Sequence, residues 1–428
     1  MQKIYNPERS TWSELLKRPT QTVADIENVV LNVFDGVKIE GDRAIDRYTQ
    51  KFDKVTLDAI VVSSEEIQEA KNLVNNELKE AIVLAKSNIE VFHAAQKTEK
   101  VSVETINGVS CWQEKRPIEK VGLYIPGGTA PLFSTILMLA VPANIAGCKE
   151  IVLCSPPNTE GKINPAILYT AALCGVTKIF KVGGIQAIAG MTFGTETIPQ
   201  VYKIFGPGNQ FVTVAKQLAT KFGVAIDMPA GPSELLVVAD DTANASFVAS
   251  DLLSQAEHGK DSQVILVSTS KKLMKEVEIE VTNQCSVLPR KEIAEAAIAN
   301  SKLIYVENDT EALELINEYG PEHFIVCVAD QDFYVDNISN AGSVFIGNYT
   351  PESAGDYASG TNHTLPTNGY AKQYSGVNLD SFMKSMTFQK LSEEGIKSIG
   401  KAIEIMAEAE GLQAHKNAVT LRLNSLEK

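Results

Sequence analysis

The five histidines of this chain are the first guide to its chemistry, because an imidazole can bind a metal or transfer a proton near neutral pH. His93 lies in a helical pattern, where a structural role explains it. The other four stand near Gly, Asp, Glu or Gln in segments typical of turns: His258, His323, His363 and His415. Oxygen and imidazole donors favour a zinc site with open positions over a closed structural site built from cysteine.

The segment DLLSQAEHGKDSQ (251–263) places an amide and an imidazole on one side of a predicted helix. Gln255 and His258 are three residues apart, and Gly259 is a typical helix end. Such a pair can hold a divalent cation or a polar substrate. The same spacing is equally compatible with a histidine that only stabilises the C-terminal end of the helix dipole.

The segment EYGPEHF (318–324) places a carboxylate and an imidazole at the start of a predicted strand. Gly320 and Pro321 end the preceding helix. Glu322 and His323 therefore lie at a strand mouth, a position where open α/β sheets bind ligands. Adjacent residues do not share a face, so we expect His323 to accept a proton and Glu322 to orient or activate water. A helix-cap environment explains the two residues equally well.

Two further segments add potential ligands. Residues 347–376 are rich in Gly, Pro, Ser, Thr and Asn, and a loop of this length is usually functional or disordered. It contains Asp356 and His363. Near the C-terminus, Glu410 and His415 flank a glycine that interrupts a helical pattern. Each pair alone is a weak signal, but with the donors described above they form a set of His, His, Asp and Gln that suits zinc.

Three glycine-rich turns are candidates for nucleotide binding, although the fingerprint G-x-G-x-x-G does not occur. Each follows a predicted strand and precedes a helical stretch, so its backbone N–H groups could face a phosphate. The turns are IPGGTAP (125–131), VGGIQAIAG (182–190) and FGPGNQF (205–211). Tight connections between sheet and helix explain the glycines equally well, so these residues alone indicate an α/β metalloenzyme and leave nucleotide binding open.

The elements that must position these residues follow an α/β pattern. Residues 11–100 are helical in pattern, and from residue 121 on short β-branched runs alternate with helical stretches. Strands separated by helices imply right-handed crossovers and mostly parallel sheets. The runs are too many for one compact sheet, so we predict two α/β domains. The predicted strands are 121–125, 150–154, 178–182, 203–206, 234–239, 263–268, 303–306, 323–328 and 343–347.

Composition argues against several classes of protein. The net charge of −14, from 53 acids and 39 bases, argues against a nucleic-acid partner, which requires a basic surface. The N-terminus shows no apolar signal region, and the longest apolar stretch, 136–146, is interrupted by Pro142 and Asn144, so we expect no membrane span. The six cysteines form no C-x-x-C pair and are typical of buried thiols in a reducing compartment. We therefore expect a cytoplasmic protein.

Several long motifs resemble the histidinol dehydrogenase family, in order and with family-like spacing from about residue 20 to the end. Two small departures are Ile185 before Gln186 and Phe211 where a tyrosine is expected, and neither touches a proposed ligand. The motifs are GLYIPGGTAPLFSTILMLAVPANIAGCKEIVLCSPP (122–157), VGGIQAIAG with FGTETIP (182–199), KIFGPGNQFV (203–212), AGPSELLVVAD (230–240), DLLSQAEHGKDSQVIL (251–266), YGPEHF (319–324), SVFIGNYTPESAGDYASGTNHTLPT (343–367) and AEAEGLQAHKNAV (407–419).

This resemblance implies two Rossmann-like domains with mostly parallel sheets, plus helical N- and C-terminal extensions. The expected parts are an N-terminal helical extension at 1–20, a discontinuous first α/β domain made of 21–120 and 236–376 that carries most zinc ligands, a second α/β domain at 121–235 on the NAD side, and a C-terminal helical tail at 377–428 that docks on the partner subunit.

The resemblance also implies the site residues, each carried over from its own motif. Zinc, one ion per subunit, would be held by Gln255, His258, Asp356 and His415. The proton-transfer pair would be Glu322 and His323. These six residues would also contact the substrate, together with Ser233, His363 and Glu410. The NAD contacts would be Tyr124, Gln186 and Asn209.

The implied activity is the four-electron oxidation of L-histidinol to L-histidine through bound histidinal, with two NAD, as the last step of histidine biosynthesis. The implied assembly is a homodimer in which C-terminal residues complete the partner's site, with no nucleic-acid or membrane partner. Two other functions are compatible with the residues: a zinc-dependent hydrolase of a small nitrogenous substrate, and a non-enzymatic sensor or binding protein that kept the fold.

Overall fold

The computed structural model describes residues 1–19, 23–127 and 131–427, which form two compact units. The larger unit consists of Met1–Gln96 and Ile118–Phe382, and the smaller unit consists of Lys97–Pro117 and Met383–Lys428. The expected domain boundary at residues 20 and 21, and residues 128–130 of the first glycine-rich turn, lie outside the described residues.

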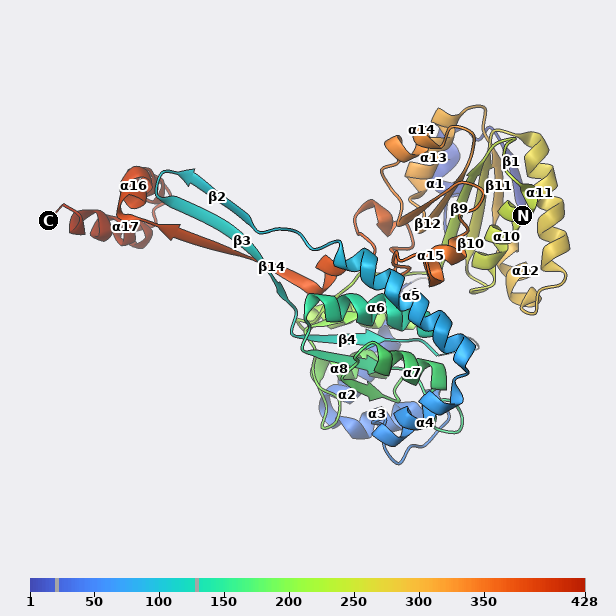
Figure 1. The fold of residues 1–428 in the computed structure, drawn as a ribbon, viewed down its shortest axis with the longest axis horizontal. Helices are drawn as coiled ribbons and strands as arrows, with labels where there is room; N and C mark the ends of the chain where they lie inside the picture. Colours follow the sequence, from blue (N-terminus) through green and yellow to red (C-terminus); the bar gives the residue numbers. More distant parts are fainter. Residues whose placement is uncertain (20–22, 128–130, 428) are drawn as a thin grey trace. The chain divides into compact units, whose positions relative to one another are not determined.

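The larger unit contains a six-stranded parallel sheet in the order β1-β11-β10-β9-β12-β13 (Figure 1). Alternate residues of β9 enter opposite cores, with Leu235 and Val237 on one face and Leu236 and Val238 on the other. Both faces are therefore buried, as is usual for a parallel sheet. The strands are β1 (Gln2–Tyr5), β9 (Glu234–Ala239), β10 (Gln263–Ser268), β11 (Lys302–Tyr305), β12 (His323–Cys327) and β13 (Ser343–Ile346).

Helices cover both faces of this sheet. One face packs against α10 (Ala245–Ala256), α11 (Lys271–Cys285) and α12 (Lys291–Ala299). The other face packs against α1 (Trp12–Leu15), α13 (Asp309–Tyr319) and α14 (Gln331–Asn337). Short helical segments complete this region and the connections around it: η1 (Arg9–Thr11), α15 (Glu352–Tyr357), η2 (Tyr370–Lys372) and η3 (Leu379–Phe382).

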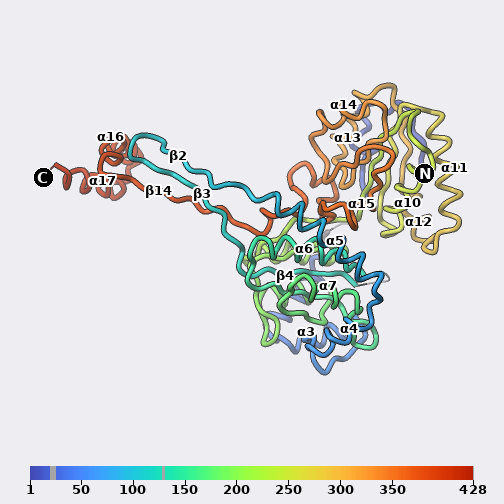
Figure 2. The backbone as a smooth tube through the Cα atoms, viewed as in Figure 1, coloured from blue at the N-terminus to red at the C-terminus, as the bar shows by residue number. Residues whose placement is uncertain are grey.

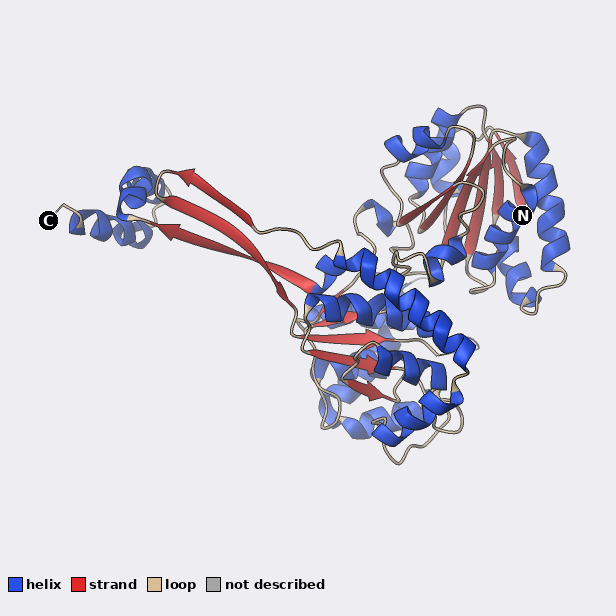
Figure 3. Cartoon of the chain, in the orientation of Figure 1, coloured by secondary structure: helices blue, strands red, loops and turns tan. Residues whose placement is uncertain are grey.

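The larger unit also contains a five-stranded parallel sheet in the order β6-β5-β4-β7-β8, with helices beside it (Figure 3). Its strands are β4 (Lys120–Tyr124), β5 (Glu150–Cys154), β6 (Lys178–Phe180), β7 (Lys203–Phe205) and β8 (Ala225–Ile226). One core joins the sheet to α2 (Val23–Glu40), α3 (Asp42–Phe52), α8 (Gly184–Phe193) and α9 (Gln210–Lys221). The remaining helices are α4 (Ser64–Leu73), α5 (Asn76–Ala94), α6 (Phe133–Ala146) and α7 (Pro165–Leu173).

The smaller unit is an antiparallel three-stranded sheet followed by two helices. The sheet order is β14-β3-β2, and the backbone trace shows the three strands running side by side (Figure 2). The strands are β2 (Val101–Ile106), β3 (Val109–Pro117) and β14 (Met383–Leu391), and the helices are α16 (Glu393–Ala409) and α17 (Gln413–Ser425). The tail that we expected to be helical thus includes a nine-residue strand, because β14 pairs with a strand far away in the sequence.

The structure confirms the α/β fold class with mostly parallel sheets, and all nine predicted strands occur close to their predicted bounds. Residues 2–5, which we placed in a helical extension, form β1 instead and pair with β11 at the edge of the six-stranded sheet. The long segment 347–376 is irregular except for α15 and η2. Among the described residues, no helix is long and apolar enough to cross a membrane.

Candidate active site

The predicted proton-transfer pair lies at the amino end of β12, beside the start of the neighbouring strand β9. Glu322 precedes β12 and His323 is its first residue, and both side chains are buried. His323 stands in register with Leu235 of β9, which directly follows Ser233 and Glu234. The pair therefore lies at the amino edge of the six-stranded sheet, whereas ligands of open α/β sheets usually bind at the carboxyl edge.

The main chain of Glu234 holds both members of this pair. Its N–H donates to Glu322 Oε2 at 2.9 Å, and its carbonyl oxygen accepts from His323 Nδ1 at 3.2 Å. A carbonyl oxygen can only accept, so Nδ1 carries a proton and Nε2 is the ring nitrogen that can exchange one. His323 Nε2 is buried, and the described residues offer it no hydrogen bond. The geometry thus presents Nε2 as the basic atom.

Carboxylates surround this imidazole. Glu322 Oε2 and Glu352 Oε1 each lie 3.7 Å from His323 Nδ1, and Asp356 Oδ1 lies 3.7 Å from Nε2. Burial lowers the pKa of His323, but the carboxylates outweigh burial and raise that pKa to about 10. Burial raises the pKa of Glu322 to about 8, against the opposing effect of His323. A divalent cation among these carboxylates would offset their charge and lower the pKa of His323.

Three side chains beside the pair could hold a metal ion: ligand atoms of His258, Glu352 and Asp356 all lie within 4.8 Å of one another. Gln255 is 1% exposed, and both polar atoms of its amide lack a hydrogen-bond partner among the described residues. A buried amide without partners is costly, and cation binding would remove that cost. Nitrogen and oxygen donors without a thiolate suit zinc in a site with open positions.

The connection after α10 places the predicted ligand His258. The helix ends at Ala256, so His258 lies just beyond it, and its N–H donates to the Gln255 carbonyl oxygen at 3.2 Å. Gln255 and His258, which were predicted to lie on one side of a helix, are therefore separated by the helix end: Gln255 is in α10 and His258 is in the turn after it. This turn leaves the His258 side chain exposed and Gln255 buried.

Glu352 was missed by the sequence reasoning. It is 1% exposed, it accepts a hydrogen bond from Ser254 Oγ at 3.0 Å, and burial raises its pKa to about 8. Glu352 and Asp356 are four residues apart in α15, a spacing that puts both carboxylates on one side of a helical turn. That spacing was a usable signal, but the composition of segment 347–376 predicted an irregular loop.

The predicted substrate residues fall into two groups. Ser233 and His363 lie in the larger unit, and both are partly buried. His363 Nδ1 bonds the Asp356 carbonyl oxygen at 2.8 Å, and His363 Nε2 lies 3.2 Å from Thr135 Oγ1. Burial lowers the pKa of His363, which favours the neutral ring. Glu410 and the predicted metal ligand His415 lie in the smaller unit, where both are exposed.

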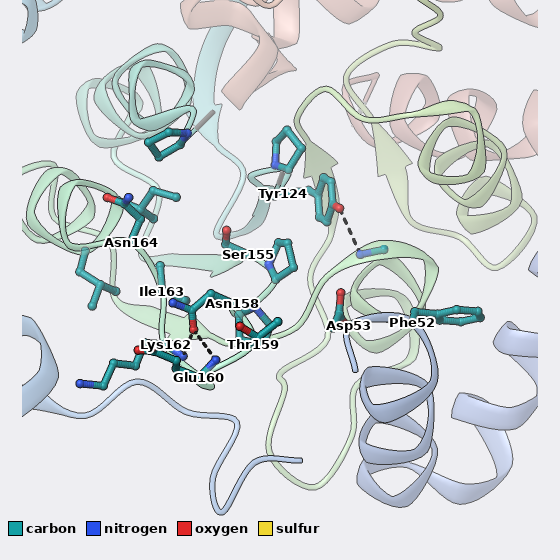
Figure 4. Close-up of a pocket in the computed structure, with 18 of the residues that line it drawn as sticks. Phe52, Asp53, Tyr124, Ser155, Asn158, Thr159, Glu160, Lys162, Ile163 and Asn164 are labelled. Carbon is teal, nitrogen blue, oxygen red and sulfur yellow. Dashed lines mark hydrogen bonds between the residues drawn. The ribbon is translucent and has the colours of Figure 1, made fainter. Parts of the chain in front are cut away.

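A second candidate site is a cavity of about 990 Å³ at the carboxyl edge of the five-stranded sheet (Figure 4). Segments that follow β4, β5, β6 and β7 contribute to its lining. Tyr124, Gln186 and Asn209, the three predicted NAD contacts, all line it. This position follows the usual rule for ligands of open α/β sheets.

Main-chain N–H groups and polar side chains shape this cavity. The Tyr124 hydroxyl accepts from Gly184 N–H at 3.1 Å at the start of α8 (Figure 4). Asn209 caps α9 at its N-terminus. Gln186 Nε2 donates to Asp53 Oδ2 at 3.3 Å, whereas the buried Gln186 Oε1 lacks a partner among the described residues. Helix N-termini suit phosphate groups, and Gln186 Oε1 suits a ligand hydroxyl or amide N–H.

Asp53 was also missed by the sequence reasoning, and Figure 4 shows it beside Phe52 at the cavity. It follows the last residue of α3, and a local pattern at that position shows only a helix end. Burial raises the pKa of Asp53 to about 6.

Comparisons with known proteins cover almost the entire chain. Residues 16–423 match the sequence profile of a family described as histidinol dehydrogenase. A histidinol dehydrogenase of Bacteroides thetaiotaomicron is 61% identical over 426 residues, with 100% of both chains covered. The Escherichia coli K12 protein of the same name is 54% identical over 416 residues, which cover 96% of this chain and 95% of that protein. The crystal structure of histidinol dehydrogenase from Elizabethkingia anophelis matches with a TM-score of 0.98 and 59% identity, covering 100% of this chain and 99% of that one.

Proposed function

The chain belongs to the histidinol dehydrogenase family, and from this premise we propose that it oxidises L-histidinol to L-histidine in two NAD-dependent steps. The observation that carries the proposal is the Glu322–His323 pair, which the main chain of Glu234 holds by two hydrogen bonds. The pair lies beside the three side chains that could hold a metal ion, His258, Glu352 and Asp356. A base, a water-orienting carboxylate and a cation site are the groups that an alcohol-to-acid oxidation needs.

We propose that zinc, one ion per subunit, is bound by Gln255, His258 and Asp356 together with His415 of a second copy of the chain. The unpartnered buried amide of Gln255 and the adjacent imidazole and carboxylate support this set. Zinc bound there would act as a charged template for the amine and imidazole nitrogens of the substrate. Glu352 would add negative charge beside the ion.

In the first oxidation, His323 Nε2 accepts the hydroxyl proton of the amino alcohol while the carbinol carbon passes a hydride to NAD, which leaves an aldehyde. In the second, Glu322 orients a water that adds to the aldehyde. Once His323 has released the first proton to solvent, it takes a proton from the hydrate as a second hydride passes to a second NAD. This leaves the carboxylic acid, which loses its remaining proton to solvent as the carboxylate forms. Hydrogen bonds to Glu234 keep both side chains oriented through the two steps.

We propose that the 990 Å³ cavity binds NAD through Tyr124, Gln186 and Asn209. The starts of α8 and α9 would hold the pyrophosphate. Ser233, His363 and Glu410 would contact the substrate. Since His363 is hydrogen-bonded through both ring nitrogens, we propose that it also fixes the position of Asp356.

We further propose a cytoplasmic homodimer in which Glu410 and His415 serve the site of the partner copy. The exposure of both side chains in the smaller unit supports this arrangement. The expected division of the chain also stays a proposal, except that β1 joins the six-stranded sheet, α2 and α3 pack against the five-stranded sheet, and 97–117 forms one unit with 383–428.

The deciding experiment is a turnover assay on metal-stripped and zinc-restored protein that counts NADH formed per histidinol consumed. We expect two NADH per histidinol with zinc and almost no turnover without it. Loss of histidinol without NADH would instead indicate the hydrolase, and binding without turnover would indicate a sensor. Neither alternative is favoured by the comparisons.

A further inference from the structure

The main chain of Glu234 hydrogen-bonds to both members of the proton-transfer pair. Contacts that fix the position of Glu234 therefore also fix the positions of these two side chains. The side chain of Glu234 is almost completely buried, with 3% exposed. It forms an ion pair with Arg18, a residue of the N-terminal segment more than two hundred positions away in the sequence.

The Arg18 guanidinium binds this carboxylate with two parallel hydrogen bonds. Nε donates to Glu234 Oε1 at 2.5 Å, and Nη2 donates to Oε2 at 2.8 Å. A paired geometry of this kind fixes direction as well as distance, which a lysine cannot do.

Arg18 also contacts the end of α13, which leads into β12. Nη2 donates to the Tyr319 carbonyl oxygen at 2.9 Å, and the guanidinium carbon lies 4.0 Å from the centre of the Tyr319 ring. Tyr319 is the last residue of α13, three residues before Glu322. A cation at this helix end is also favoured by the helix dipole. One side chain therefore contacts the start of β9 and the helix end that leads into β12.

The same carboxylate fixes a third segment. Asn368 N–H donates to Glu234 Oε1 at 2.6 Å, at the end of the long segment that carries Asp356 and His363. Nearby, Gly231 N–H donates to Thr367 Oγ1, which ties this segment to the chain before β9. Glu234, the first residue of β9, is thus the common partner of Arg18 in the N-terminal segment, of Glu322 and His323 at the start of β12, and of Asn368 in segment 347–376.

We propose that Arg18 is a positioning residue for the oxidation: through its buried ion pair with Glu234 and its contact with Tyr319, it sets the relative positions of Glu322 and His323. Burying two charges costs free energy that apolar side chains of the same volume would not, so stability alone is a poor reason for this pair. Its benefit is orientation, because small misplacement of catalytic groups is costly in rate. The inference deepens the proposed function and rests on the roles assigned there to Glu322 and His323.

The test compares Arg18→Met, Arg18→Lys and Glu234→Gln with the wild-type enzyme, assayed well below the Tm of each variant. We expect kcat to fall about 10- to 100-fold in Arg18→Met, with bound zinc unchanged and the KM values for histidinol and NAD within about threefold. Glu234→Gln should behave similarly, and Arg18→Lys should restore part of kcat. The matched control is Arg9→Met, which removes an exposed ion pair with Glu314 from the same N-terminal segment and should leave kcat unchanged.

A purely structural role would lower the Tm of Arg18→Met but leave the kcat of the folded enzyme within about threefold of wild type, and that result would overturn the proposal. A second test places Arg18→Met in a His323→Asn background. If Arg18 acts through His323, adding Arg18→Met to His323→Asn should lower kcat by less than about threefold relative to His323→Asn alone. An equal loss in both backgrounds would also overturn the proposal. Failure of the proposed function itself would be seen separately, as near-normal turnover in His323→Asn alone.

Discussion

The two candidate sites lie at opposite edges of their sheets, and the difference explains what each can bind. The cavity lies at the carboxyl edge of the five-stranded sheet, where α8 and α9 begin. The polar cluster lies at the amino edge of the six-stranded sheet, where α10 and α13 end. Helix N-termini present N–H groups and favour anions, whereas C-termini present carbonyl oxygens and favour cations. The strand edge thus favours an anionic group at the cavity and a cation at the polar cluster, which is consistent with the proposed NAD and zinc sites.

The two sites also differ in where their polar groups come from. The cavity is lined in part by glycine-rich turns, and Gly184, whose N–H donates to the Tyr124 hydroxyl, illustrates the constraint. Its φ is 58°, in the left-handed region that favours glycine. The cluster relies on polar and charged side chains brought together from the end of α10 and the turn after it, the start of β12, and α15. Single side-chain changes should therefore affect the cluster far more than the cavity.

The largest effect should follow from removing a metal ligand. His258→Asn should lose both bound zinc and turnover with the fold intact, because the side chain is exposed and supports no core. Metal analysis and circular dichroism measure the two outcomes. Glu257→Gln, one position away, is the matched control and should keep its zinc. Stoichiometric zinc in His258→Asn would refute the ligand set.

Removing the base should have the next largest effect. His323→Asn should keep zinc and substrate binding but lose about two to four powers of ten in kcat, the usual contribution of a positioned base. Steady-state kinetics with calorimetric substrate titration separates the two properties. A loss smaller than tenfold would remove His323 from the role.

Mixed dimers test whether the cluster is completed by a second copy. Asp356→Ala and His415→Ala should each be inactive alone. After mixing and subunit exchange, a heterodimer contains one intact site, so activity should return to about a quarter of wild type. No recovery, in samples shown by mass spectrometry to contain heterodimers, would mean that each site is built from one chain.

On the cavity side, a single substitution should have a smaller effect. Gln186→Leu removes the acceptor Oε1 and also the donor to Asp53, so the KM for NAD should rise about three- to tenfold, with zinc content and the KM for histidinol unchanged. The readout is initial-rate kinetics at varied NAD. A loss of zinc in this variant would show that the two sites are not separable.

The smallest effect concerns Asp53 and pH. Burial raises its pKa to about 6, so the folded state binds the proton more tightly than the unfolded state. The free energy of unfolding is therefore unaffected by this group below about pH 4, where Asp53 is neutral in both states. It falls as pH rises through about 6, because the buried carboxyl must then ionise. Asp53→Asn stays neutral and can still accept from Gln186, so its Tm should exceed wild type by roughly 1–3 °C at pH 7.5. The difference should vanish near pH 4, and thermal melts at both values test it.

Local patterns in the sequence were enough to predict much of the secondary structure. Buried parallel strands appear as continuous β-branched runs, so nine strands were predicted close to their bounds. The position of Glu322 and His323 at a strand start was also predicted correctly, because a helix end followed by a strand start is a local signal. Strands β1, β2, β3, β8 and β14 were not predicted. Of these, β1 and β14 become strands only by pairing with a distant partner, β11 or β3.

How these elements combine into a site follows from long-range contacts in the folded chain. Glu352 joins His258 and Asp356 because α15 forms inside a segment whose composition predicts a loop. Arg18 reaches Glu234 because the N-terminal segment packs where β9 and β12 begin. The physical reason is the same in both cases: propensity and hydrophobic period act over a few residues, whereas buried charges are placed by contacts between segments far apart in the chain.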